Sequence, residues 1–181
     1  MKSIAIFIPS IVALLLASLC LITDLRSRRI PNVLTLPAVG IGLLLGLMLG
    51  GWEGLANSAI GLGLGLAVMI IPYLVGGMGA GDVKLMAALG ALMGHPAIIH
   101  VFLYTILIGG LFSLVNALSR GTLRSALGNM YQWTKSLALQ RLGGLRAGLT
   151  ETELAQTAGV IPYGVAIALG LYAYLAFGEV I

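Results

Sequence analysis

Asp24 and Asp82 are the side chains of this sequence that most clearly suggest a chemical function, because both are ionisable groups next to long apolar runs. Asp24 ends a long apolar run, and Asp82 lies between the glycine-rich stretch 76–81 and another apolar run. An ionisable group at a membrane boundary is energetically costly and commonly functional. Two carboxyl groups that meet share a proton, so the ionised one can activate water while the protonated one polarises a carbonyl. The pair therefore predicts acid–base hydrolysis of the aspartyl-protease kind.

The composition is that of an integral membrane protein. Of 181 residues, 59% are hydrophobic and only 9% are charged, whereas about a quarter of the residues in soluble domains are charged. We therefore predict an all-α, polytopic membrane domain covering residues 1–181. About six spans are predicted, at 4–23, 33–50, 55–75, 83–94, 97–118 and 160–178. The first run is long enough to span a bilayer, so we interpret it as a retained helix rather than a signal peptide.

The basic residues predict how these spans are oriented. Nine of the ten lysines and arginines fall in loops on one side, which we assign to the cytoplasm, and Lys2 alone lies on the other. Both termini are then non-cytoplasmic. Two spans separate Asp24 from Asp82, so both return to the cytoplasmic face, where packing of the first and fourth spans would bring them together. The cytoplasmic loop 119–159 is expected to contain a basic amphipathic helix at 122–140, on the inner membrane surface.

Each aspartate also has a purely structural interpretation. Asp82 is a suitable N-cap for a helix beginning at Val83, and Asp24 can pair with Arg28. The conjunction of same-side placement, a glycine-rich entry and a short fourth span favours catalysis instead. Asp82 lies at the expected positive end of a helix dipole and Asp24 at a negative end. We therefore expect Asp82 to be mainly ionised and Asp24 mainly protonated, although the arginines near Asp24 oppose this.

Other residue classes narrow the range of functions. Cys20 is the only cysteine, which excludes a disulfide framework and a cysteine-based zinc site, and we predict no metal and no cofactor. The net charge of +4 lies in loops, so it does not indicate nucleic-acid binding. His95 and His100 are expected near the outer face, far from both aspartates. The glycine runs at 42–50 and 61–65 are typical of close helix packing in membranes.

Three segments resemble motifs of the type IV prepilin peptidases. They are Gly79-Ala80-Gly81-Asp82-Val83-Lys84-Leu85, which resembles the GxGD motif, Asp24 with Arg28-Arg29-Ile30-Pro31-Asn32, and the last-helix segment 161–168 with Pro162 and Gly164. The resemblance implies an intramembrane aspartyl endopeptidase that cuts the basic leader from prepilins at the cytoplasmic face. It implies that Asp24 and Asp82 are the catalytic pair.

The resemblance also implies roles for the neighbouring motif residues. Gly79 and Gly81 would let the backbone pass closely, Pro162 and Gly164 would shape the last helix, and Lys84 is as well suited to anchoring at the interface as to catalysis. Long family members carry a cysteine-rich segment between the first two spans and also N-methylate the new pilin terminus. This chain has only about nine residues there, so we expect a peptidase without methyltransferase activity.

The short form resembles the peptidases of tight-adherence (Flp) pilus systems, with the archaellin-leader peptidases as a second short relative. The resemblance therefore implies Flp-type prepilins and pseudopilins as substrates and the bacterial inner membrane as the location. Two other classes of function stay open. A small transporter or channel also uses intramembrane carboxylates, although both acids here lie at one face. A structural component of a secretion machine would need neither aspartate. The oligomeric state does not follow from the sequence.

Overall fold

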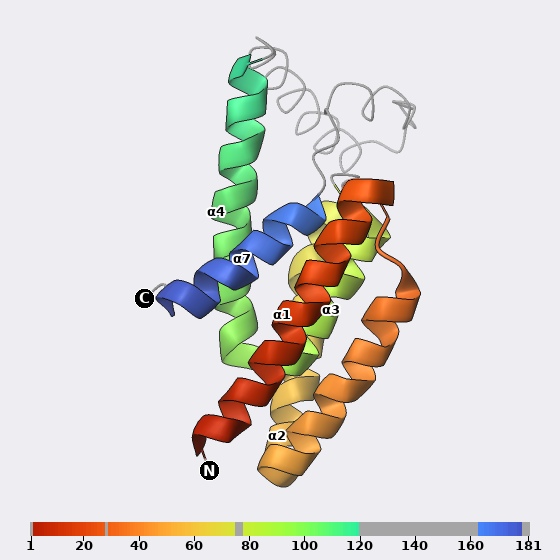
Figure 1. Ribbon diagram of the computed structural model, residues 1–181, viewed down its shortest axis with the longest axis vertical. Helices are drawn as coiled ribbons and strands as arrows, with labels where there is room; N and C mark the ends of the chain where they lie inside the picture. Colours follow the sequence, from red (N-terminus) through yellow and green to blue (C-terminus); the bar gives the residue numbers. More distant parts are fainter. Residues whose placement is uncertain (1, 28, 75–77, 120–162, 179–181) are drawn as a thin grey trace, which may run out of the picture. The chain divides into compact units, whose positions relative to one another are not determined.

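The structure is a computed structural model that describes residues 2–27, 29–74, 78–119 and 163–178. Within these ranges every regular element is a helix (Figure 1), which confirms the predicted all-α class for this part of the chain. The helices are α1 (Lys2–Ser27), α2 (Asn32–Leu74), α3 (Ala80–Met93), α4 (His95–Ser119) and α7 (Tyr163–Phe177).

The chain groups into two compact units, one formed by Met1–Gly109 with Pro162–Ile181 and the other by Gly110–Ile161. Of the second unit, the structure describes only residues 110–119, which are the end of α4. The predicted amphipathic helix at 122–140 lies outside the described residues, so it stays a prediction. The fold and the site described below belong to the first unit.

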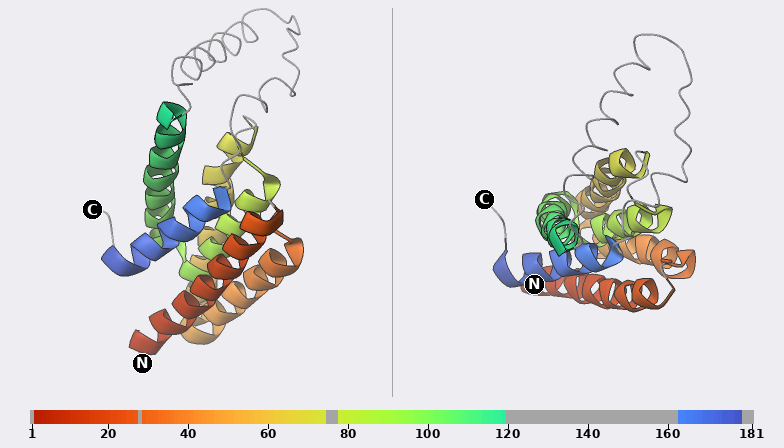
Figure 2. Two further views of the ribbon diagram at one scale, coloured as in Figure 1. Left: turned by 45° about the horizontal axis from the view of Figure 1, so that its top comes forward. Right: turned by 90° about the horizontal axis from the view of Figure 1, so that it is seen from above.

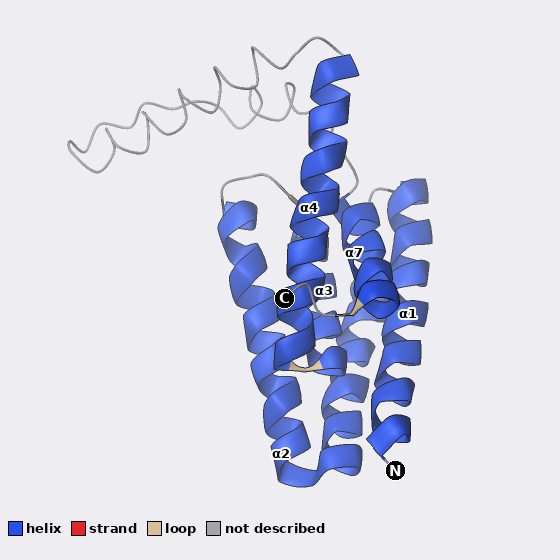
Figure 3. Ribbon diagram, turned by 90° about the vertical axis from the view of Figure 1, so that its left-hand side faces the viewer, coloured by secondary structure: helices blue, strands red, loops and turns tan. Residues whose placement is uncertain are grey.

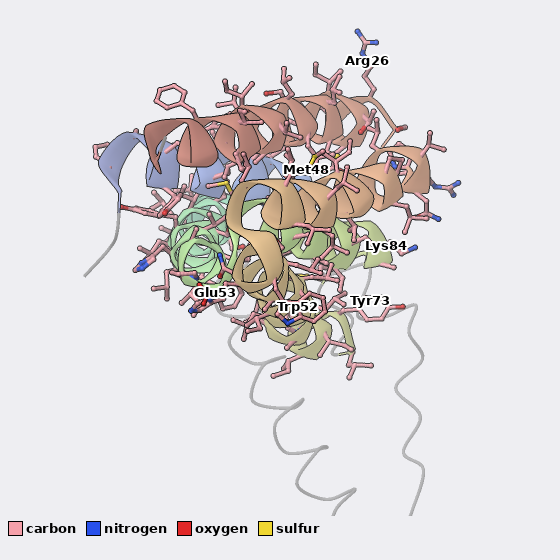
Figure 4. All side chains as sticks on the ribbon, turned by 90° about the horizontal axis from the view of Figure 1, so that it is seen from below. Arg26, Met48, Trp52, Glu53, Tyr73 and Lys84 are labelled. Atoms are coloured by element: carbon pink, nitrogen blue, oxygen red, sulfur yellow. The ribbon has the colours of Figure 1, made fainter. Side chains whose placement is uncertain are left out.

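Among the described residues, three helices are long and apolar enough to cross a membrane. These are Phe7–Ser27, Asn32–Leu74 and His95–Asn116, and α7 is a shorter apolar helix. Large apolar side chains cover the outside of the bundle; Trp52 is 79% exposed and Met48 is 74% exposed (Figure 4). Such a surface is unusual for a protein in water, and it is compatible with a membrane protein. The number of spans and the side on which the termini lie stay predictions.

Helix α2 contains the second and third predicted spans, joined at Gly51. This glycine has φ 60° and ψ −144°, a conformation that costs glycine little because it has no Cβ. The two halves of α2 therefore fold back on each other, as Figure 3 shows. The backbones of Gly46 and Gly54 meet so closely beside this reversal that a Cβ at either would overlap the other. The predicted boundary near residue 50 is thus a tight turn within one helical segment.

Helix α3 is the buried centre of the first unit. Ten of its fourteen residues are buried, and it packs against α2, α1 and α7 (Figure 2). Fourteen residues make a helix of only about 21 Å. Because other helices cover α3, its ends need not reach both faces of a bilayer. This explains how the short fourth span predicted at 83–94 fits into the bundle.

Close backbone contact joins α2 to α3. A Cβ at Gly65 would lie 2.5 Å from the carbonyl oxygen of Met86, and one at Gly42 would lie 2.7 Å from the carbonyl carbon of Ala91. By contrast, a Cβ at Gly63 would have nothing within 4 Å. The predicted role of the glycine runs in close packing is therefore confirmed at Gly42, Gly46, Gly61 and Gly65, and not at Gly50 and Gly63.

Asn57 of α2 holds the end of α3 that is remote from Asp82. Its Oδ1 atom accepts a hydrogen bond from the backbone N–H of His95 (3.1 Å) and also contacts His95 Nδ1. The first N–H groups of a helix lack partners within that helix, so Asn57 caps α4 from a different helix. Gly94, which separates α3 from α4, has φ 82°. His95 thus lies at the opposite end of α3 from Asp82, as predicted.

The contrast between Gly65 and Gly63 gives a test of this packing. We expect Gly65→Ala to lower the free energy of unfolding by about 1–3 kcal/mol, because the added methyl group meets the backbone of Met86, which cannot rotate away. Gly63→Ala should be neutral or stabilising by about 0.5–1 kcal/mol, because alanine favours a helix over glycine. Thermal or denaturant unfolding of both variants in one detergent measures the difference. Equal effects at the two positions would contradict the described packing.

Candidate active site

Asp24 and Asp82 are the two buried carboxylates at one end of the first unit. Asp24 lies in the last turn of α1 and is 6% exposed, and Asp82 lies in the first turn of α3 and is 8% exposed. Helices α1 and α3 pack against each other, and Asp24 is near enough for its charge to act on Asp82. The structure therefore places the two carboxyl groups on helices that pack against each other, within electrostatic range.

Hydrogen bonds with Gly79 hold Asp82 in place. The N–H of Gly79 donates to Asp82 Oδ2 (3.1 Å), and the N–H of Asp82 donates to the carbonyl of Gly79 (3.1 Å). The alternative, structural interpretation took Asp82 as the N-cap of a helix beginning at Val83, and this is wrong: the helix starts at Ala80, and Gly79 is its N-cap. Asp82 is the third residue of the helix, from which an acidic side chain reaches back to the N-cap N–H.

The environment of Asp82 changes its acidity. The pKa of Asp82 is raised to about 6: burial is the largest cause, the hydrogen bond from Gly79 lowers the pKa, and the charge of Asp24 raises it. Asp82 lies in α3, which is not one of the three described helices that are long and apolar enough to cross a membrane. A carboxyl group with a pKa near 6 is mostly ionised at neutral pH and still exchanges protons readily. The contribution from Asp24 requires that Asp24 itself is charged, so the shift does not support the expectation that Asp82 is the ionised member and Asp24 the protonated one. That assignment stays a prediction.

The two glycines of the GxGD motif have different surroundings. A Cβ at Gly81 would lie 2.9 Å from Ile30 Cβ and 3.4 Å from Ile30 N, so the segment after Asp24 passes tightly over the first turn of α3. Gly79 has an ordinary φ of −82°, and a Cβ there would come no closer than 3.5 Å to Asp82 Oδ2. The close backbone approach that the resemblance implied for both glycines is therefore found at Gly81 and not at Gly79.

Lys84 joins the two motif segments at the edge of the bundle. Its Nζ atom donates a hydrogen bond to Asn32 Oδ1 (2.9 Å). Asn32 is the first residue of α2 and belongs to the same motif segment as Asp24. In Figure 4 the side chains of Lys84 and Arg26 both lie at the periphery. The sequence analysis quoted Asn32 as part of a motif but did not pair it with Lys84, because nothing in a sequence gives the register of two helices.

Gly164 is the third motif position in contact with this site. It is the second residue of α7, and a Cβ there would lie 2.5 Å from Asp24 Oδ2 and 3.2 Å from Asp24 Cβ. The sequence analysis expected Gly164 only to shape the last helix, so its contact with Asp24 was missed. Pro162, the other motif residue of this segment, lies outside the described residues.

Two further observations concern ligands. Among the described residues, no group of three or more His, Cys, Asp or Glu side chains is arranged to hold a metal ion. A cavity of about 390 Å³ lies at the Asn57 end of the unit, lined mainly by apolar residues that include Leu49, Met93 and Tyr174. None of the motif residues lines this cavity.

The candidate site is a coupled carboxylate pair enclosed by α1, α3 and the start of α7. This arrangement is suited to acid–base chemistry.

Comparison with known proteins places this site in context. Residues 11–114 match the type IV leader peptidase family. The chain is 42% identical over 98 residues to the prepilin leader peptidase/N-methyltransferase of Aeromonas salmonicida, which covers 50% of the chain and 33% of that protein. It is 32% identical over 114 residues to the protein of the same name from Bacillus subtilis, covering 61% and 45%.

The match to the Neisseria gonorrhoeae protein of that name is 34% identical over 105 residues, covering 54% of the chain and 36% of that protein. The chain therefore spans about a third to a half of the length of these curated relatives. No solved structure matches the chain.

The raised pKa of Asp82 can be measured directly. We expect infrared spectra to show a protonated carboxyl band that disappears with a midpoint near pH 6 and is missing in Asp82→Asn. In Asp24→Asn the midpoint should be lower, because the charge of Asp24 contributes to raising the pKa of Asp82.

The sign of the linked stability change follows from the same shift. Because the folded pKa of about 6 exceeds the ordinary value of 3.8, the folded state binds the proton more tightly. The resulting stability is present at low pH and is lost as the pH rises through 6. A midpoint near pH 4, or a pH dependence between 4 and 6 that Asp82→Asn leaves unchanged, would contradict the described burial.

Proposed function

Because the chain belongs to the type IV leader peptidase family, we propose that it is an aspartyl endopeptidase that removes the basic N-terminal leader from prepilins. The observation that carries the proposal is the burial of Asp24 and Asp82 as an electrostatically coupled pair. Both lie within the residues that match the family. The names of the relatives, prepilin leader peptidase/N-methyltransferase, support prepilins as the substrate class.

In the proposed reaction, the ionised carboxylate of the pair takes a proton from a water molecule. The water oxygen bonds to the carbonyl carbon of the scissile peptide while the protonated carboxyl group of the pair donates a hydrogen bond to the carbonyl oxygen. The tetrahedral intermediate then collapses: the C–N bond breaks, and a proton moves from the dyad to the leaving amine. Water supplies the only new atoms, so no metal or cofactor is required.

The apolar exterior supports a substrate that lies partly in the bilayer. A prepilin would keep its apolar helix in lipid and its basic leader in the cytoplasm, which places the scissile bond at the inner interface beside both carboxylates. We propose Flp-type prepilins and pseudopilins as the substrates and the bacterial inner membrane as the location. We also propose cleavage without N-methylation, because the single cysteine, Cys20, is buried in α1 and only residues 28–31 connect α1 to α2.

The experiment that tests this function is the processing of a co-expressed Flp-type prepilin by the wild-type chain, Asp24→Asn and Asp82→Asn. We expect the wild type to shorten the prepilin, and each variant to lose at least about 10³-fold in rate, since asparagine cannot exchange the proton. Immunoblotting follows the size of the prepilin, and membrane fractionation checks that each variant is inserted.

Processing by both variants at the wild-type rate would remove the catalytic role of the pair. Failure of the wild type on a panel of leader-bearing prepilins would overturn the peptidase proposal itself. Mass spectrometry of the new pilin terminus tests the proposed absence of methyltransferase activity. A methylated terminus would contradict it.

The unequal surroundings of the motif glycines predict unequal effects on cleavage. We expect Gly81→Ala to lower the cleavage rate about 10- to 100-fold, because its methyl group meets Ile30 and moves the turn that carries Asp82. Gly79→Ala should retain most activity, because a Cβ fits there and φ is ordinary. Initial rates on one prepilin, at matched enzyme levels, compare the two. A larger loss in Gly79→Ala would contradict the described geometry.

A further inference from the structure

We infer that the N-terminal turn of α7 positions the Asp24 carboxylate, with Gly164 as the positioning residue. The inference rests on the proposed function for its catalytic consequence, but the contact itself is a property of the fold. Three helices then form the site: α1 carries Asp24, α3 carries Asp82, and α7 is remote from both aspartates in the sequence.

The contact between Gly164 and Asp24 is specific. The three atoms nearest to a Cβ placed on Gly164 all belong to the Asp24 side chain: Oδ2 at 2.5 Å, Cγ at 3.0 Å and Cβ at 3.2 Å. Rotation of the carboxylate would relieve the contacts of Oδ2 and Cγ but not that of Cβ, which is attached to the backbone of α1. Any side chain at position 164 therefore moves either the carboxylate or one of the two helices.

The packing of α1 on α7 holds this contact in register. Ser18 Oγ and Tyr172 Oη are hydrogen-bonded at 2.7 Å. From that bond, Asp24 lies six residues forward along α1 and Gly164 eight residues back along α7, or about 9 Å and about 12 Å of helix rise. The two helices therefore run in opposite directions, and the hydrogen bond and the glycine contact are two points along one interface. Figure 1 shows α7 alongside α1.

The start of α7 also affects the electrostatics of the pair. Its first turn presents N–H groups without partners in the helix and the positive end of the helix dipole. When it assigned the proton to Asp24, the sequence analysis weighed the negative end of α1 against the nearby arginines and did not include α7. Asp24 in fact lies between the end of α1 and the start of α7, which act on it in opposite senses. Each carboxylate thus lies at a helix start: Asp82 at its own, and Asp24 at that of α7.

A double-mutant cycle between positions 164 and 24 tests the contact. We expect Gly164→Ala to lower the thermal midpoint in the wild-type background. In the Asp24→Ala background it should be neutral or stabilising, because two of the three contacting atoms are gone and alanine favours a helix. Gly170→Ala is the matched control, since a Cβ there meets Thr105 rather than Asp24. It should lower the midpoint equally in both backgrounds.

Prepilin cleavage provides the readout that a merely structural role would not change. At a temperature where all variants are folded, Gly164→Ala should lose about 10- to 100-fold in kcat with little change in KM, because a displaced catalytic group slows the chemical step and leaves binding intact. Gly170→Ala should keep the wild-type kcat.

Additive effects of Gly164→Ala and Asp24→Ala would overturn the contact. Coupling in stability with an unchanged kcat would overturn the positioning role. The thermal double-mutant cycle needs no substrate, so it tests the contact between Gly164 and Asp24 independently of cleavage. If the wild type cleaves no prepilin, that result counts against the proposed function and not against the contact.

Discussion

The rest of the structure depends on the burial of two carboxylates at one end of an otherwise apolar bundle. Removing a carboxylate from water costs several kcal/mol unless charge or hydrogen bonds compensate. Asp82 is compensated by its place in the first turn of α3 and by the N–H of Gly79. Asp24 does not lie in the first turn of its own helix, because it is in the last turn of α1. The start of α7 supplies a second helix N-terminus beside it.

The position of α3 follows from this constraint. Its first turn must carry Asp82 to α1, and its body is short and almost entirely enclosed. Close backbone contact with Gly42 and Gly65 of α2 leaves α3 little freedom to slide, and Asn57 holds the turn at its far end. The α2 hairpin and α3 thus form a rigid frame that presents Asp82, while α1 and α7 together present Asp24.

The match to the leader peptidase family begins at residue 11 within α1, covers α2, α3 and most of α4, and ends at residue 114. Both aspartates lie within it, so the part that matches the family contains the chemical pair. Helix α7 lies outside the match and still contacts Asp24 through Gly164. The environment of the pair therefore depends on a segment whose relation to the family rests on the last-helix motif alone.

Much of the architecture followed from the sequence alone. The apolar runs predicted the helices and the boundary near Gly51, because a bilayer favours long uninterrupted apolar helices. Counting spans led to the packing of the helices that carry Asp24 and Asp82, which the structure contains as the contact of α1 with α3; the side of the membrane stays a prediction. These inferences need only hydropathy and parity, both of which are properties of the order of residues along the chain.

Only the tertiary structure decided which side chains touch. The apolar run placed the start of α3 at Val83, whereas the backbone begins the helix at Ala80, within the glycine-rich stretch. The two motif glycines look alike in sequence, yet only Gly81 meets another segment closely. The contact of Gly164 with Asp24 depends on the register and crossing of α1 and α7. Register is set by the packing of whole helix faces, so no single motif contains it.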